Sequence, residues 1–185
     1  MKIALTGTHS TGKTTLLYDL AEHLPEYVVI SEQLRRAAAD LGLEKISDAH
    51  KRGLFSTLQW EGLRRQVNME EEAGDKFITD RATLDYDIYY RYGIGSGDSW
   101  AVKIAYSNLA WHRLRKYDLI IYVPPNIPLV DDGVRHAEEG EQFRLEIDRL
   151  IMDRIHWCVD VEVLELQSSQ RGRRIENCLD KIGMM

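Results

Sequence analysis

The sequence predicts an α/β fold in which a five-stranded parallel sheet lies between layers of helices. Short apolar runs rich in β-branched residues alternate along the chain with longer runs of helical periodicity. Several of the short runs are almost entirely apolar, which is typical of strands covered on both faces. The helical runs are long enough to cross over between parallel strands. We therefore expect one three-layer domain over residues 1–185.

The predicted elements follow one another in a regular order. Strands are expected at residues 2–6, 27–30, 76–79, 118–123 and 161–166. Helices are expected at residues 14–23, 33–41, 48–73, 83–92, 100–115, 140–157 and 171–183.

Local residues justify the boundaries between these elements. The run Ile3-Ala4-Leu5 makes the first strand, and a glycine-rich turn leads from it into the first helix. Ser31-Glu32 after the second strand and Asp80 after the third are residue types that begin helices. The glycine-rich segment 93–98 is a turn between two helices, because no strand precedes it. Three of the four prolines lie within 124–128 and stiffen the exit from the fourth strand.

Residues 7–14 form the pattern G-x-x-x-x-G-K-[ST] between a predicted strand and a predicted helix. Small residues let successive backbone N–H groups curl around an anion, and the helix N-terminus adds partial positive charge. Lys13 would contact the β- and γ-phosphates, and the Thr14 hydroxyl would bind Mg²⁺. The pattern predicts a P-loop NTPase fold that binds a nucleoside triphosphate through Gly7, Thr8, His9, Ser10, Thr11, Gly12, Lys13, Thr14 and Thr15.

The composition limits the classes of partner. The chain has 24 basic and 30 acidic residues and a formal charge of −6, which argues against a general polyanion-binding protein. Cys158 and Cys178 are too few for a disulfide framework and are expected to be reduced. No apolar run approaches the roughly 18 residues that span a bilayer, and we expect the first residues to form a strand rather than a signal peptide. We expect a cytoplasmic monomer or homodimer with no membrane partner.

Polar residues follow the predicted strands, at the edge where open parallel sheets bind ligands. Glu32 follows the second strand and is a candidate to orient an acceptor hydroxyl or to accept its proton. Arg35 lies one helical turn later and would share its face, as a second substrate-binding residue. Helix capping by Glu32 is the alternative interpretation.

The third strand ends at a second polar group. Asp80 stands where an acid in P-loop proteins holds the Mg²⁺ and its water shell, although it would also cap the next helix. Arg81 would be costly to bury unpaired, so we expect it to face a phosphate or Asp80. Asp85 is a candidate substrate-binding residue. The alternative is an acid on an exposed helix face, which would have the same local sequence. The catalytic candidates here are Lys13, Glu32, Asp80 and Arg81.

A lid is expected around residues 131–145. Gly133 permits a sharp turn and Arg135 opens a charged segment. Closure of a lid would exclude water and bring a cation to the transferring phosphoryl group. Arg135 is the first candidate for this catalytic cation. Arg144, in the following helix, is the second candidate, and we expect it to bind substrate. An ordinary solvated loop is the alternative.

Other residues give weaker signals. The four tryptophans and the tyrosines at 86–92 have helical spacing, so packing is their default role. The segment Arg171-Gly172-Arg173-Arg174 either covers the nucleotide base or begins a solvated helix. No Cys/His cluster has the spacing of metal ligands, so Mg²⁺ carried by the nucleotide is the metal we expect.

These motifs together resemble the small P-loop kinases of nucleosides and nucleotides, and most closely the ribosylnicotinamide kinase domain of bacterial NAD-biosynthesis regulators. The matching segments are the phosphate loop, 31–35, 77–80, 117–121 and, most distinctively, 126–135. The resemblance implies a five-stranded parallel core, ATP, Mg²⁺ and transfer to a ribose-like hydroxyl. It also implies that Glu32 holds the acceptor, that Asp80 holds the water shell of the metal and that Arg135 is the cation of the lid. Arg81 directly after the acid is similar instead to thymidylate and deoxynucleoside kinases, which leaves phosphate-bearing acceptors open.

The sequence thus predicts an ATP- and Mg²⁺-dependent phosphotransferase acting on a nucleoside or nucleotide. One alternative is a kinase acting on a nucleic-acid hydroxyl, which the acidic net charge disfavours. Another is an NTPase switch, which the strand-end acids and lid arginines disfavour. The choice between Glu32 and Asp80 as proton acceptor stays open, as does the choice between ATP and GTP.

Overall fold

The computed structural model describes residues 1–93, 97–128, 140–157 and 160–183. The strands are β1 (Lys2–Thr6), β2 (Val28–Ile30), β3 (Phe77–Thr79), β4 (Leu119–Tyr122) and β5 (Glu162–Glu165). The helices are α1 (Lys13–His23), α2 (Gln33–Asp40), α3 (Asp48–Lys51), α4 (Phe55–Ala73), α5 (Thr83–Tyr92), α6 (Trp100–Leu114), α7 (Gly140–Ile155) and α8 (Arg171–Ile182).

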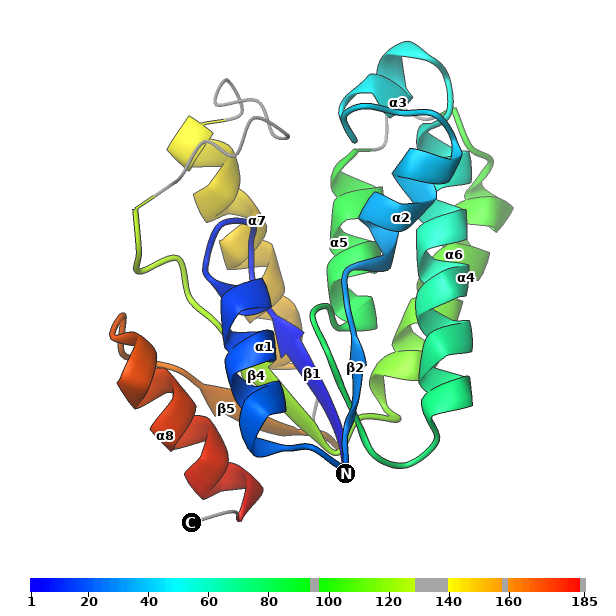
Figure 1. Ribbon diagram of the computed structural model, residues 1–185. Helices are drawn as coiled ribbons and strands as arrows, with labels where there is room; N and C mark the ends of the chain where they lie inside the picture. The colour runs from blue at the N-terminus through cyan, green and yellow to red at the C-terminus, as the bar shows by residue number, and fades with distance from the viewer. Residues whose placement is uncertain (94–96, 129–139, 158–159, 184–185) are drawn as a thin grey trace.

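The five strands form one parallel sheet in the order β2-β3-β1-β4-β5 (Figure 1). β1 is central, and its residue Ala4 pairs with Thr79 of β3 and Ile120 of β4. All the carboxyl ends therefore lie at the same edge of the sheet. The loop between β1 and α1 lies at this edge, which is where the sequence predicts the site. The predicted α/β class with a five-stranded parallel sheet is confirmed.

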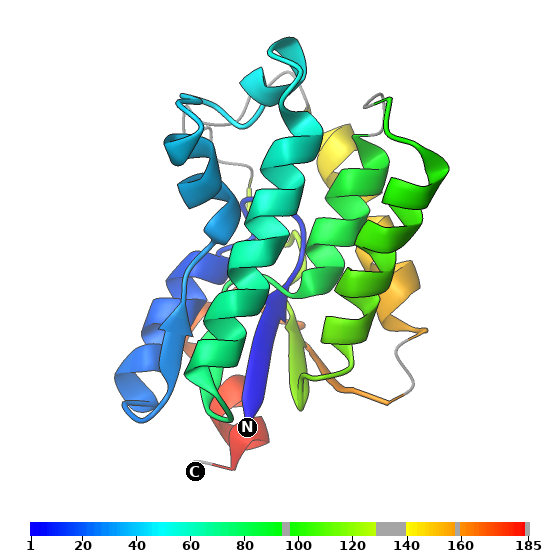
Figure 2. The ribbon, with the colours of Figure 1, turned by 90° about the vertical axis from the view of Figure 1, so that its right-hand side faces the viewer.

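Alternation along β1 divides the core into two layers. Ile3 and Leu5 pack against leucines of α1 and against α8. Ala4, between them, packs on the opposite face against residues of α5 and α7. A third cluster fills the space between α2, α4, α5 and α6, which stand together on one side of the molecule (Figure 2). Both faces of the sheet are covered, which explains why the inner strands β1, β3 and β4 are so apolar.

The helix predicted over 48–73 is divided in two, and this prediction was wrong. α3 ends at Lys51 and α4 begins at Phe55. Gly53 between them has φ of 65°, in the left-handed region where a helix cannot continue. The Phe55 ring stacks on His50 with ring centroids 4.0 Å apart, which packs the two helices across the break.

Packing was also the wrong expectation for two of the tryptophans. Trp100 is 76% exposed and Trp157 is 79% exposed. Each lies near an end of its helical segment, where periodicity does not tell which residues other elements cover. Trp60 and Trp111 do pack against core clusters, as expected.

No helix in the described part of the chain is long and apolar enough to cross a membrane.

Candidate active site

The phosphate loop has a backbone that only glycine fits at its first position. Gly7 has φ of 142°, and a Cβ atom added there would lie 2.4 Å from the carbonyl oxygen of Val123. Ser10 and Gly12 also have positive φ values, of 55° and 86°. The loop therefore runs close against the end of β4 and then turns directly into α1 at Lys13.

Lys13 folds back over the loop. Its Nζ atom donates to the carbonyl oxygen of Thr8 at 2.5 Å and to the Thr11 hydroxyl at 3.3 Å. The side chain is only 5% exposed. The ammonium group is therefore held inside the turn, where an anion bound by the loop would meet it.

Thr14 and Asp80 meet at the carboxyl end of β3. The Thr14 hydroxyl donates to Oδ2 of Asp80 at 2.7 Å, although the two residues are 66 positions apart. The other oxygen of Asp80, Oδ1, is buried without a hydrogen-bond partner. A hydroxyl beside a carboxylate with an unpaired oxygen is a donor set that suits a hard cation such as Mg²⁺. Among the described residues, no three His, Cys, Asp or Glu side chains are grouped to hold a metal by themselves.

Arg81 links the phosphate loop to the end of β2. Its guanidinium donates to the carbonyl oxygen of Gly7 at 3.3 Å and to Oε1 of Glu32 at 3.3 Å. Arg35 approaches the other oxygen of Glu32 at 2.9 Å. Tyr89 lies against Arg81, whose guanidinium carbon is 5.5 Å from the centroid of the tyrosine ring. The candidate acceptor-side carboxylate is therefore held between two guanidinium groups beside the loop.

Asp85 lies under the loop rather than on an exposed helix face. Its Oδ1 accepts a hydrogen bond from the Thr6 hydroxyl at 2.7 Å, and Oδ2 is 3.9 Å from Arg81. Burial raises the pKa of this carboxyl, while the charges of Arg81 and Lys13 oppose the rise. With these buried partners, Asp85 is placed to support the loop and Arg81 from below.

The structure describes only part of the predicted lid over residues 131–145. Arg135 and residues 131–139 lie outside the described residues. Arg144, in the first turns of α7, is 1% exposed and donates to the carbonyl oxygens of Ser10 and Ile127 at 3.2 and 2.9 Å. The structure therefore places Arg144 against the outside of the phosphate loop.

The remaining predicted loop residues lie close together. Thr8 and His9 are buried, and the His9 ring lies 3.4 Å from the Tyr89 hydroxyl. The Thr11 hydroxyl donates to the carbonyl oxygen of Thr8 at 3.3 Å. Thr15 lies exposed in the first turn of α1.

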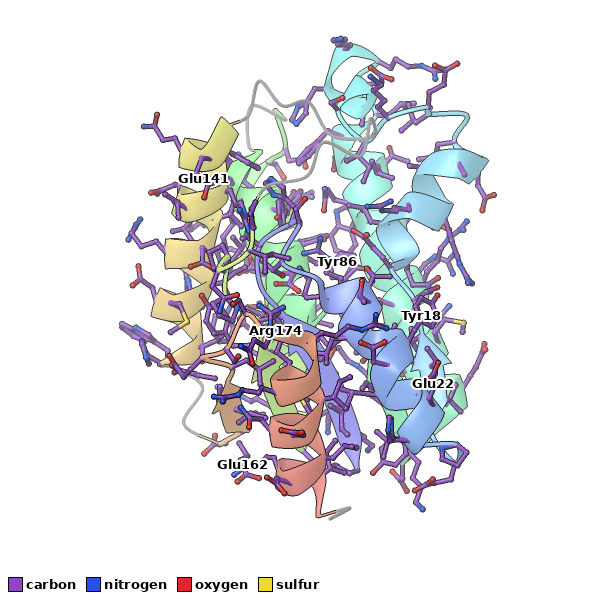
Figure 3. The ribbon with its side chains drawn as sticks, turned by 60° about the vertical axis from the view of Figure 1, so that its left-hand side comes forward. Tyr18, Glu22, Tyr86, Glu141, Glu162 and Arg174 are labelled. Carbon is purple, nitrogen blue, oxygen red and sulfur yellow. The ribbon has the colours of Figure 1, made fainter. Side chains whose placement is uncertain are left out.

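The sequence pointed to Arg174 only within the segment 171–174, as a cover for the nucleotide base or the start of a solvated helix. Arg174 is in fact buried and contacts the phosphate loop from α8. It donates to the carbonyl oxygen of Thr11 at 2.7 Å and to that of Ser168 at 2.8 Å, and it also bonds to the side chain of Asn126. Figure 3 shows Arg174 near the start of α8. A signal was present in the sequence: Arg174 lies four residues before Cys178, on the face that α8 buries.

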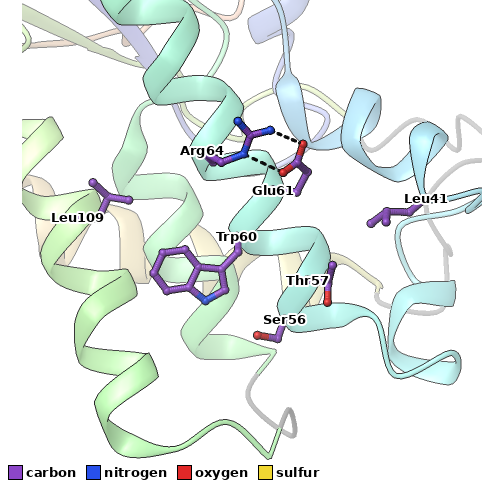
Figure 4. A pocket seen from close by; sticks show the side chains of 7 residues that line it. All are labelled: Leu41, Ser56, Thr57, Trp60, Glu61, Arg64 and Leu109. Atoms are coloured by element: carbon purple, nitrogen blue, oxygen red, sulfur yellow. Dashed lines mark hydrogen bonds and ion pairs between the residues drawn. The ribbon is translucent and has the colours of Figure 1, made fainter.

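A groove of about 560 Å³ lies elsewhere, beside α4 and α6 (Figure 4). Its charged members Glu61 and Arg64 pair with each other. None of the predicted site residues lines it; the lining residues are Leu41, Ser56, Thr57, Trp60, Glu61, Arg64 and Leu109. The convergence at the phosphate loop, and not this groove, defines the candidate site.

The parallel sheet and the glycine-rich loop before α1 define a P-loop NTPase-like fold. The chain matches the family described as an AAA domain over residues 2–174, and it belongs to that family. No curated protein matches the chain.

Solved structures share the fold along its whole length. Deoxyadenosine kinase from M. mycoides with bound dCTP aligns with a TM-score of 0.72 at 18% identity, covering 100% of both chains. The same kinase with the products dCMP and a flexible dCDP bound aligns with a TM-score of 0.73 at 17% identity, again covering 100% of both chains. NadR protein in complex with NR aligns with a TM-score of 0.67 at 21% identity, covering 99% of this chain and 52% of that chain.

These neighbours confirm the resemblance to P-loop nucleoside kinases as a likeness of fold. The chain spans about half the length of the NadR protein.

Proposed function

We propose that the protein is an ATP- and Mg²⁺-dependent kinase that transfers the γ-phosphoryl group to a hydroxyl of a nucleoside-like small molecule. The observation that carries this proposal is the convergence of three groups at one edge of the sheet. Thr14 of the loop over residues 7–14 pairs with Asp80, and Lys13 is buried within the same loop. The Arg81–Glu32 pair contacts the loop at Gly7. The nucleoside-kinase folds of the neighbours support the same class of acceptor.

The donor would be held by the loop. Its backbone N–H groups and Lys13 would bind the phosphates, with the α1 N-terminus adding partial positive charge. Thr14 and Asp80 would hold Mg²⁺, which supplies charge neutralisation on the phosphates. Phosphoryl transfer passes through a loose transition state, so these residues act mainly by position and charge.

The acceptor would lie on the Glu32 side of the loop. Asp80 already bonds to Thr14, which fits the role of cation ligand and leaves Glu32 as the carboxylate that orients the acceptor hydroxyl and takes its proton. Arg81 and Arg35 would fix the direction of the Glu32 carboxylate. Arg81 also contacts Gly7, so it would couple the position of the acceptor carboxylate to that of the donor loop.

The test is consumption of ATP or GTP by the purified protein with Mg²⁺ and a panel of nucleosides, ribosylnicotinamide, nucleoside monophosphates and single-stranded DNA. The proposal predicts that nucleotide consumption depends on one of the nucleoside-like acceptors. Lys13→Ala should reduce turnover by roughly 10²-fold or more. Lys116→Ala, an exposed lysine away from the loop, is the control and should leave the rate unchanged.

Consumption that depends on DNA and falls steeply with salt would favour a nucleic-acid acceptor instead. Consumption that no added acceptor changes would favour an NTPase switch. Either result would refute the small-molecule kinase.

A further inference from the structure

Four carbonyl oxygens of the phosphate loop accept hydrogen bonds from buried cationic side chains. The pairs are Gly7 with Arg81, Thr8 with Lys13, Ser10 with Arg144 and Thr11 with Arg174. Arg81 and Lys13 belong to the site described above. Arg144 and Arg174 come from α7 and α8 and are separated from their loop partners by 134 and 163 positions.

Because the peptide unit is planar, these two hydrogen bonds affect how the loop can bind an anion. In a trans peptide, the carbonyl and the N–H of the next residue point in opposite directions. A donor that holds the Ser10 carbonyl outward therefore turns the Thr11 N–H inward, and a donor on the Thr11 carbonyl does the same for the Gly12 N–H. Inward-facing N–H groups in succession are what form an anion-binding loop.

The loop needs such support because part of its backbone is strained. Ser10 is the one non-glycine residue with positive φ in the described chain, at 55°. A residue held in this region costs about 1–2 kcal/mol and persists only where its surroundings over-determine it. The bond from Arg144 to the Ser10 carbonyl is such a constraint.

Both arginines are already occupied by protein groups. Arg144 also donates to Ile127 and pairs with Glu141, whose first-turn position on α7 is labelled in Figure 3. Arg174 also bonds to Ser168 and Asn126, and it is 5% exposed. The terminal nitrogens of both arginines are thus committed to protein groups, and the Nε of Arg144, which has no hydrogen-bond partner among the described residues, is buried, so neither guanidinium presents a free fork to a phosphate.

We propose that Arg144 and Arg174 are positioning residues that hold the phosphate loop in its anion-binding form before the ligand arrives. This proposal depends on the proposed function in one respect, which is that the ligand carries a polyphosphate. It changes the role expected for Arg144, from a cation that contacts the phosphoryl group to one that shapes the loop from outside.

The test uses Arg144→Met, Arg144→Lys, Arg174→Met and Arg174→Lys in the full chain. The controls are Arg149→Met on α7 and Lys181→Met on α8. Within the described residues, Arg149 pairs with Glu146 and Asp153, and Lys181 pairs with Glu162. Two quantities are measured on folded protein. The first is amide hydrogen exchange at residues 10–12 without ligand, and the second is the Kd for ADP and for inorganic tripolyphosphate.

The Met variants should speed loop exchange and weaken tripolyphosphate binding roughly 10- to 100-fold, the loss expected for one hydrogen bond from a charged donor to a group that must stay oriented. The controls should stay within about twofold of the unsubstituted chain. The Lys variants keep the charge but replace the rigid planar guanidinium fork with one compact ammonium group, which does not reproduce the fork's geometry, so they should recover less than half of the lost affinity on a logarithmic scale. If a Met variant does not fold, the Lys variant is compared directly with the unsubstituted chain, and it should still speed exchange at residues 10–12 and weaken tripolyphosphate binding.

Unchanged exchange and affinity in the folded variants would overturn the proposal. Full recovery by lysine would also overturn it, because charge alone would then be sufficient. Failure of the kinase proposal looks different: the chain would bind tripolyphosphate, with the predicted sensitivity to Arg144 and Arg174, yet show no acceptor-dependent consumption of ATP.

Discussion

Replacing Gly7 by alanine tests the closest contact of the phosphate loop. The new Cβ would lie 2.4 Å from the Val123 carbonyl oxygen, where ordinary contacts begin at 3.4 Å. The atom that it meets is backbone of the sheet exit, so no side-chain rotation can relieve the overlap. Gly7 also has φ of 142°, a region that residues with a Cβ rarely adopt.

Two contributions add to the expected loss of stability. The strained backbone costs about 1–3 kcal/mol. Displacing packed backbone costs about 1–3 kcal/mol more. We expect Gly7→Ala to lower the free energy of unfolding by about 2–6 kcal/mol, out of a total of about 5–15 kcal/mol for a typical domain. The surviving folded protein should bind ADP weakly, because the loop can relax only by moving away from β4.

The assay is urea unfolding together with ADP titration. Gly42→Ala is the matched control: Gly42 has φ of 66° but nothing within 4 Å of an added Cβ. It should cost only about 1 kcal/mol and leave ADP binding intact. If Gly7→Ala lowers the free energy of unfolding no more than Gly42→Ala and the variant binds ADP normally, our reasoning is wrong. The close approach of the loop to Val123 would then determine neither stability nor ADP binding.

Three further predictions follow from other parts of the molecule. Glu32→Gln should lower kcat by roughly 10²- to 10⁴-fold while the Kd for ADP changes less than about threefold, and an unchanged kcat would remove Glu32 as the proton acceptor. Burial raises the pKa of Glu70 above 4.5, so its contribution to stability is complete below pH 4.5 and is lost as the pH rises through the raised pKa. The difference in unfolding free energy between the unsubstituted chain and Glu70→Gln should therefore shrink with rising pH, and a difference that grows would contradict this sign. Burial raises the pKa of Cys178 to about 12, so in a Cys158→Ser variant a thiol reagent should label Cys178 at pH 8 only as fast as the protein unfolds, and rapid labelling of native protein would refute its burial.

Most of the fold could be predicted from the sequence because its signals are local. Apart from the segment 48–73, the predicted helices and strands match the observed ends within two residues. Apolar runs mark strands that are buried on both faces, and glycine, proline and acidic residues mark their ends. The one division that was missed, at Gly53, depends on a single left-handed residue inside a segment of continuous helical periodicity.

The candidate site could be predicted only in part. The phosphate loop is contiguous in sequence, and the strand-end rule identifies Glu32, Asp80 and Arg81, which the structure places beside that loop. The environment of Asp85 could not be predicted from its local sequence. An acid in the first turn of a helix has the same local sequence whether it faces water or lies buried under the loop, and only the position of α5 against β1 decides between them.

By itself the sequence determined the phosphate loop, the order of strands and helices and the edge of the sheet at which we expect a ligand to bind, because each of these is specified by neighbouring residues. Only the tertiary structure decided that Arg144 and Arg174 bond to the loop carbonyls and that Asp85 lies beneath them. Their partners are distant along the chain, and such contacts arise from how α5, α7 and α8 pack on the sheet, which no local pattern encodes.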